Sequence, residues 1–164
     1  MFDPETLALA QSVWDACRTR NWRIATAESC TGGLVAAALT AIPGASEVLE
    51  RGFVTYSHTA KIELLAVPPE TIAAHGAISA ETAAAMAQGA AIRAGVDLAV
   101  SVTGIAGPGG GTAQKPVGLV YLGVARRGGA VRVERHRFPG DRAAVRQAAL
   151  IEALMMLQAE ARAA

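Results

Sequence analysis

The sequence has few cysteines, few aromatic side chains, few lysines and no long hydrophobic run. Its two cysteines, Cys17 and Cys30, are too few for a disulfide scaffold and lack metal-ligand spacing, so we expect a reduced, cytoplasmic protein. The apolar stretches are far shorter than the ~20 residues that a membrane span requires, and no signal-peptide pattern opens the chain. We therefore expect a soluble protein with no membrane partner.

Net charge and composition limit the kinds of binding partner that we expect. The 15 basic and 14 acidic residues give a net charge of +1, which demands no polyanionic partner. Aromatic residues make up 4% of the chain, so a surface for stacking nucleic-acid bases has little material. With 52% apolar and 18% charged side chains in 164 residues, the composition predicts one globular domain over residues 1–164.

Hydrophobic periodicity and capping residues predict helices that alternate with short strands. The expected helices span 4–19, 34 to before Pro43, 58–65, the Ser79 cap to 94, and the Gly140 or Asp141 cap to 158. The expected strands span 23–28, 47–56, 98–103, 117–126 and 131–138, of which the last two flank Gly128 and Gly129 and are expected to form a β-hairpin. The prolines at 68–69 are expected to stop a helix. This order predicts an α/β fold, a three-layer sandwich of helices around a mixed β-sheet.

Three segments that follow predicted strands carry most of the polar and glycine residues. They span 28–33, 55–58 and 103–112. In open α/β sheets, ligands bind beyond the carboxyl ends of the strands. We therefore predict that these three segments meet in one cleft.

Ser29 lies between a predicted strand and a glycine-bearing helix start. There its hydroxyl would face a substrate, and free N–H groups of Gly32 and Gly33 would face a developing negative charge. The alternative is that Ser29 or Thr31 only caps the helix. The Gly-x-Ser-x-Gly pattern of one hydrolase class is absent, because Ala27 stands two residues before the serine.

A nucleophilic serine needs a base, and the three histidines of the chain are poorly placed for that role. Lys61 is the better candidate, one helical turn after Ser57, and burial could lower its pKa enough to make it a base. A solvated helix lysine is the alternative. Cys30 is a rival nucleophile without an obvious histidine partner, and a buried structural thiol is its alternative.

The glycine-rich run over 104–112 fails two phosphate-binding motifs. Gly110 stands where a P-loop needs lysine, and a strand rather than a helix follows the run. Seven arginines lie between 126 and 146, and they form either a solvated face or a nucleic-acid contact. Arg142 and Arg146, four residues apart at a helix start, could instead hold one phosphate of a small ligand.

Four motifs in this order resemble the CinA C-terminal domain family, the nicotinamide mononucleotide deamidases. They are residues 27–33 (AESCTGG), 54–57 (VTYS) with Lys61, 102–118 (VTGIAGPGGGTAQKPVG), and 140–142 (GDR). The resemblance extends from about residue 5 to 157. It implies hydrolysis of nicotinamide mononucleotide to nicotinate mononucleotide and ammonia, through an acyl-enzyme, in pyridine nucleotide salvage. Many family members carry a further N-terminal domain, so we expect this chain to be the stand-alone form.

The resemblance also implies roles for individual residues. Ser29 would be the nucleophile and Lys61 its base, with Tyr56 beside them. The substrate-binding residues would be Thr31, Gly32, Gly33, Thr103, Gly104, Gly107 and Arg142. No cofactor and no metal are expected, the partner is a small nucleotide, and a homodimer is common among similar proteins. The alternative is a protein that binds nucleotide or nucleic acid without catalysis, linked to competence or DNA damage.

Overall fold

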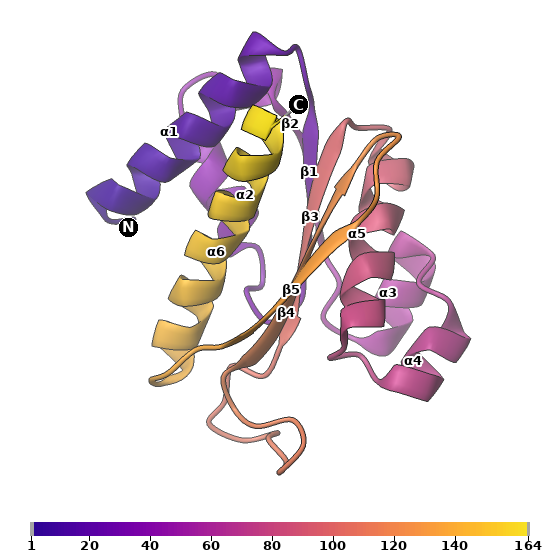
Figure 1. The fold of residues 1–164 in the computed structure, drawn as a ribbon. Helices are drawn as coiled ribbons and strands as arrows, with labels where there is room; N and C mark the ends of the chain where they lie inside the picture. Colours follow the sequence, from indigo (N-terminus) through magenta and orange to yellow (C-terminus); the bar gives the residue numbers. More distant parts are fainter. Residues whose placement is uncertain (1, 164) are drawn as a thin grey trace.

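Five strands form a mixed sheet through the middle of the molecule, in the order β2-β1-β3-β4-β5 (Figure 1). The computed structural model describes residues 2–163. The strands are β1 (Ile24–Glu28), β2 (Leu49–Val54), β3 (Leu98–Gly104), β4 (Leu119–Arg126) and β5 (Arg132–Arg137). Strand β1 pairs in parallel with β2 and β3, whereas β3–β4 and β4–β5 pair antiparallel. The predicted mixed sheet, with a hairpin at one side, is confirmed.

Helices cover both faces of this sheet (Figure 1). One face carries α1 (Pro4–Thr19), α2 (Leu34–Thr40) and α6 (Arg142–Ala163). The other carries α3 (His58–Leu65), α4 (Pro69–His75) and α5 (Ala80–Ala94), and a short 3-10 helix, η1 (Ala45–Glu47), precedes β2. Each helical layer has its own buried apolar cluster against the sheet. The three-layer sandwich is therefore confirmed.

Local signals explain where several helices begin. Asp3 accepts a hydrogen bond from the Thr6 N–H, and Pro4 occupies the first turn of α1, where a missing N–H costs nothing. Ser79 caps α5 in the same way through the Thr82 N–H. These two starts agree with the sequence prediction because a cap acts over only a few residues.

Three predicted boundaries were wrong. The prolines at 68–69 were expected only to stop a helix, but Pro69 begins α4, because proline suits a first helical turn. Strand β2 covers 49–54 rather than 47–56, and α6 continues to Ala163 rather than ending near Gln158. Within residues 2–163, no helix combines the length and the hydropathy needed to cross a bilayer.

Parallel pairing brings the ends of β1, β2 and β3 to one edge of the sheet. The Ser29 N–H, just beyond β1, donates to the Val102 carbonyl of β3 at 2.9 Å. On the other side, the Thr55 N–H, just beyond β2, donates to the Glu28 carbonyl at 2.8 Å. The segment after β1 is thus joined by backbone hydrogen bonds to the segment after β2 and to the end of β3, which leads into the third segment.

Candidate active site

Ser29 and Lys61 meet at the carboxyl edge of the sheet. Lys61 Nζ lies 3.1 Å from Ser29 Oγ, within hydrogen-bond distance. Both side chains are buried, with 1% of Lys61 and 8% of Ser29 exposed. The alternative in which Lys61 is a solvated helix lysine is therefore wrong.

The position of Lys61 follows from the start of α3. Ser57 caps this helix by accepting from the Ala60 N–H at 3.0 Å, and its carbonyl accepts from the Lys61 N–H. Lys61 consequently stands one turn into the helix, and its side chain runs back toward the edge of the sheet. Its amine also donates to the Thr55 carbonyl at 2.7 Å.

Burial lowers the pKa of Lys61 from 10.5 to about 8, because the charged amine loses its hydration; the nearby Cys30 opposes this effect. Lys61 forms no ion pair with any carboxylate of residues 2–163. A neutral amine has two N–H bonds and one lone pair. With one N–H directed to Thr55, the lone pair is available to the Ser29 hydroxyl.

Glu28 determines the shape of the turn that presents Ser29. Its carboxylate, 1% exposed, accepts hydrogen bonds from the N–H groups of Gly33, Val35 and Ala36 at 2.9–3.1 Å. A carboxylate at this helix start is also favoured by the helix dipole. Glu28 is therefore the cap of α2, a role that the sequence analysis missed.

The prediction that Gly32 and Gly33 offer free N–H groups was wrong. The Gly32 N–H donates to the Ser29 carbonyl at 3.0 Å, and the Gly33 N–H donates to Glu28. Capping of α2 by Ser29 or Thr31 was also wrong, since the Thr31 hydroxyl is buried with no partner among residues 2–163. Glycine suits positions 32 and 33 because both have positive φ, +60° and +100°.

A cavity of about 290 Å³ opens in front of the Ser29–Lys61 pair, and we call it the serine–lysine cavity. All three predicted segments contribute to its wall, which confirms that they form one cleft. Seven of the ten predicted site residues line it: Ser29, Tyr56, Lys61, Thr103, Gly104, Gly107 and Arg142. The other three, Thr31, Gly32 and Gly33, lie outside its lining.

Arg142 joins two walls of the serine–lysine cavity. One guanidinium nitrogen donates to the Gly107 carbonyl and another to the Tyr56 hydroxyl, both at 2.9 Å. Arg146, one turn later on α6, donates instead to the Cys30 and Thr31 carbonyls at 3.1 and 3.0 Å. The two arginines therefore have different contacts: Arg142 lines the cavity, whereas Arg146 binds the backbone of the turn that follows Ser29.

Cys30 is a poor nucleophile in this setting. Its side chain is 5% exposed, and burial raises its pKa to about 11. The thiol is therefore protonated at neutral pH, and the reactive thiolate is scarce. The geometry favours Ser29 over its neighbour.

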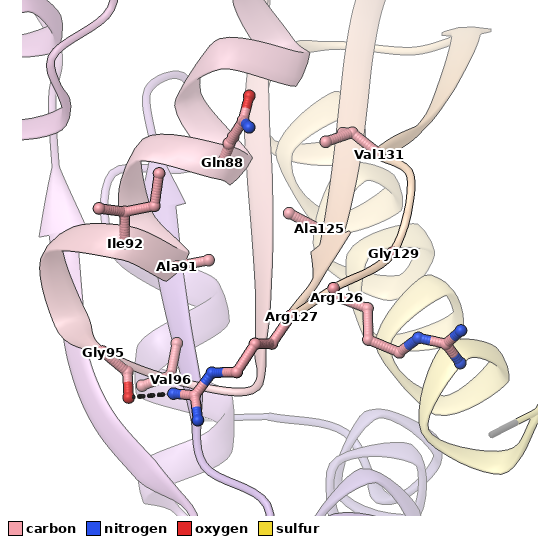
Figure 2. A pocket seen from close by; sticks show the side chains of 11 residues that line it. Gln88, Ala91, Ile92, Gly95, Val96, Ala125, Arg126, Arg127, Gly129 and Val131 are labelled. Atoms are coloured by element: carbon pink, nitrogen blue, oxygen red, sulfur yellow. Dashed lines mark hydrogen bonds between the residues drawn. The ribbon is translucent and has the colours of Figure 1, made fainter.

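A second hollow, which we call the hairpin groove, lies between α5 and the β4–β5 turn (Figure 2). It measures about 340 Å³. Gln88, Ala91 and Ile92 of α5 form one side, and Arg127 crosses its lower end to donate to the Gly95 carbonyl at 2.6 Å (Figure 2). None of the ten predicted site residues lines this groove.

Comparison with known proteins identifies the same family by a sequence model and by individual relatives. The sequence model of the CinA C-terminal domain matches residues 6–161. The nicotinamide-nucleotide amidohydrolase PncC of Enterobacter agglomerans is 48% identical over 146 residues, which cover 89% of this chain and 89% of that protein. A CinA-like protein of Geobacter sp. strain M21 is 58% identical over 135 residues, covering 82% of this chain and 32% of that protein. The chain thus spans about a third of the length of several curated relatives it matches.

A solved structure shares the whole fold. The competence/damage inducible protein CihA from Agrobacterium tumefaciens superposes with a TM-score of 0.95 at 46% sequence identity, over 97% of this chain and 97% of that chain. At this identity the likeness reflects common ancestry as well as a common fold.

Proposed function

Because the chain belongs to the CinA C-terminal domain family, we propose that it is an amidohydrolase that converts nicotinamide mononucleotide and water to nicotinate mononucleotide and ammonia. The observation that carries the proposal is the buried Lys61 amine, which lies 3.1 Å from the Ser29 hydroxyl and has no carboxylate partner among residues 2–163. The substrate is suggested by the name of the PncC relative, which matches this chain over most of both lengths. The reaction belongs to pyridine nucleotide salvage, in the cytoplasm.

In the proposed mechanism, neutral Lys61 accepts the Ser29 proton while Oγ attacks the carboxamide carbon. Protonated Lys61 then gives that proton to the departing nitrogen, the C–N bond breaks, and ammonia leaves. Water attacks the resulting ester with Lys61 again as base, which releases the carboxylate and restores the serine. Each proton that Lys61 accepts is returned within the cycle, so no cofactor and no metal is needed.

The pKa of Lys61 supports this assignment. With a pKa of about 8, roughly a tenth of the lysine is neutral at pH 7, whereas an ordinary lysine would be neutral in far fewer than one molecule in a thousand. A buried lysine beside a hydroxyl is costly to maintain, and a catalytic role accounts for that cost.

The oxyanion of the tetrahedral intermediate needs N–H donors, and those of Gly32 and Gly33 are already in use. We assign this role to the Cys30 N–H, which directly follows Ser29. Cys30 lines the serine–lysine cavity, and no oxygen of residues 2–163 accepts from its N–H. One such donor typically contributes about 10²–10³ in rate.

Residues of the outer wall would hold the rest of the nucleotide. Thr103 donates its hydroxyl to the Ala77 carbonyl at 2.7 Å and so presents a fixed surface to the cavity, beside Gly104. The guanidinium of Arg142, already held between Gly107 and Tyr56, lies at the exposed rim, where a phosphate could remain partly hydrated. We therefore assign the ribose phosphate to Arg142.

The test measures ammonia release from nicotinamide mononucleotide in metal-free buffer at mildly alkaline pH. Wild type should release ammonia, and Ser29→Ala should be slower by about 10³-fold or more. Ser46→Ala, at an exposed serine of η1, is the matched control and should keep full activity. Mass spectrometry after rapid quenching should find the acyl group on Ser29.

Two outcomes would count against the proposal. If folded wild type binds nicotinamide mononucleotide in calorimetry but releases no ammonia, the chain is a nucleotide-binding protein. If the acyl group is found on Cys30, the thiol is the nucleophile and the Ser29–Lys61 pair is not the catalytic dyad.

A further inference from the structure

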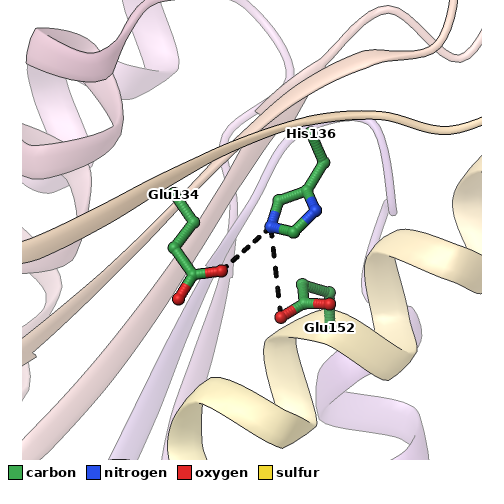
Figure 3. Close-up of side chains that lie close together, drawn as sticks. All are labelled: Glu134, His136 and Glu152. Carbon is green, nitrogen blue, oxygen red and sulfur yellow. Dashed lines mark hydrogen bonds and ion pairs between the residues drawn. The ribbon is translucent and has the colours of Figure 1, made fainter.

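Outside the lining of the serine–lysine cavity, three side chains of metal-ligand type converge between β5 and α6 (Figure 3). Glu134 and His136 stand two residues apart on β5, on the strand face that meets α6, and Glu152 approaches from the helix. His136 Nε2 lies 3.0 Å from a Glu134 oxygen and 4.0 Å from a Glu152 oxygen. One donor atom from each residue falls within 4.8 Å of the other two.

The two carboxylates of this cluster have different partners, since Glu134 pairs with Arg132 and His136 whereas Glu152 pairs with His136 alone among residues 2–163. Two carboxylates face one imidazole nitrogen, and their side chains are only 33% and 20% exposed for Glu134 and Glu152. No residue of the range 2–163 donates a hydrogen bond to the Glu152 carboxylate, whose sole ion-pair partner there is His136 at 4.0 Å. A half-buried carboxylate without a donor is costly, so the space between the three atoms favours a cation.

The surroundings orient the three groups as a metal site requires. Arg132 contacts the other oxygen of Glu134 at 3.6 Å, which leaves the first oxygen directed at His136. The His136 ring stacks on Phe138 with centroids 5.1 Å apart and an angle of 9° between the planes. Such contacts with ligand side chains fix their orientation and raise the affinity of a metal site.

The donor set selects the class of metal. One imidazole nitrogen with two carboxylate oxygens suits zinc and similar divalent transition metals, whereas magnesium and calcium prefer oxygen alone. In a tetrahedral zinc site with bonds of about 2.0–2.1 Å, ligand atoms stand about 3.4 Å apart. The two separations from His136 Nε2, 3.0 and 4.0 Å, lie on either side of that value, and all three ligand atoms lie within 4.8 Å of one another, so rotation of the side chains would bring them to zinc distance.

We propose that Glu134, His136 and Glu152 bind one divalent transition-metal ion of the zinc type, with water completing the coordination. The ion ties β5, an edge strand of the sheet, to the middle of α6. Glu152 lies ten residues beyond Arg142 on this helix, which corresponds to about 15 Å along its axis. The site is therefore structural and separate from the hydrolytic chemistry.

The test uses the full chain after treatment with EDTA and dialysis. Zinc is titrated in competition with a chromophoric chelator, and the melting temperature is measured with and without zinc. Wild type should bind one zinc per chain and melt at a higher temperature with zinc present. Loss of an outer partner typically weakens a metal site about 10–100-fold, so His136→Ala, which removes a ligand, should weaken binding by at least about 100-fold.

Two further variants keep the test decisive. Glu152→Gln preserves size and should also weaken zinc binding, so the proposal stays testable if His136→Ala does not fold. His75→Ala is the matched control, because His75 pairs with a single carboxylate, Glu81, at 3.5 Å, and it should bind zinc like wild type. X-ray absorption should show nitrogen and oxygen ligands without sulfur.

Some outcomes would overturn the proposal. They are wild type that takes up no stoichiometric zinc, His136→Ala that binds as tightly as wild type, or sulfur ligands at the metal. The first would leave the cluster as an ion-pair group, and the last would assign the zinc to a cysteine. Ammonia release by all three variants should equal that of wild type, so this result is independent of the proposed amidohydrolase activity.

Discussion

The serine–lysine cavity and the hairpin groove are similar in size, about 290 and 340 Å³, but they differ in how their charged groups are solvated. In the cavity, the Lys61 amine is buried beside the Ser29 hydroxyl and pairs with no carboxylate in the described part of the chain. In the groove, Arg127 is exposed and contacts both the Gly95 carbonyl and the Asp97 carboxylate. Size alone therefore does not distinguish a reactive site from a surface hollow, whereas an unpaired buried base does.

The energetic difference between the two regions is large. A decrease in the pKa of Lys61 from 10.5 to about 8 corresponds to about 3 kcal/mol that burial costs the charged amine. The pair of exposed Arg127 and partly exposed Asp97 contributes about 1 kcal/mol or less. The cost at Lys61 is a substantial fraction of the free energy of unfolding of a small domain, about 5–15 kcal/mol. A functional role of the Lys61 amine explains why such a cost is retained.

Replacing each of the two lysines of the chain by methionine, in separate variants, is expected to give the largest difference between a buried and a surface amine. Lys61→Met removes the base at similar size and should lower the rate of ammonia release by about 10³-fold or more. Lys115→Met should leave the rate unchanged, because the Lys115 amine donates to the His75 carbonyl and Lys115 does not line the serine–lysine cavity. Equal losses in both variants would show that the burial of Lys61 has no special role.

The pH profile gives a smaller but more specific effect. Since burial lowers the pKa of Lys61 to about 8 and only its neutral form is a base, activity should rise about tenfold per pH unit below pH 8 and level off above it. Cys30→Ala should keep the same profile, because the pKa of that thiol is about 11. A rate that falls between pH 7 and 9 would contradict Lys61 as the base.

The smallest effect comes from one arginine in each region. Arg142→Ala should raise KM for nicotinamide mononucleotide about tenfold with little change in kcat, because it removes a charged hydrogen bond remote from the carboxamide. Arg127→Ala should leave both constants unchanged and lower stability by less than about 1 kcal/mol. Steady-state kinetics and urea unfolding measure the two outcomes, and an unchanged KM in Arg142→Ala would remove Arg142 from the substrate site.

Prediction from the sequence succeeded where the signal is local. The helix start at Pro4, the Ser79 cap and the succession of strands along the chain were recognisable because each depends on a few neighbouring residues. The extra helix α4 was missed because Pro69 signals both a stop and a start, and only packing against α5 decides between them. The motifs carried by Ser29 and Lys61 were visible, but their separation of 3.1 Å was not.

The roles of two residues near the site could not be predicted from the sequence. Glu28 reads as an ordinary acidic residue after a strand, yet it caps α2 through three backbone N–H groups. Arg146 was grouped with Arg142 as a phosphate ligand, yet it supports the turn after Ser29. The adjacent Glu28 and Ser29 at a helix start are the one signal that could have suggested a carboxylate cap.

The sequence by itself determined the strands, the helices other than α4 and η1, and the segments that carry Ser29 and Lys61, because periodicity and caps act over a few residues along the chain. Only the tertiary structure decided that Lys61 is buried against Ser29, that Glu28 rather than a substrate takes the N–H groups of α2, and that Arg142 alone of its pair reaches the cavity. The physical reason is that burial and hydrogen-bond partners depend on segments far apart in the chain. The side chains of Ser29 and Lys61 acquire their chemistry from that environment.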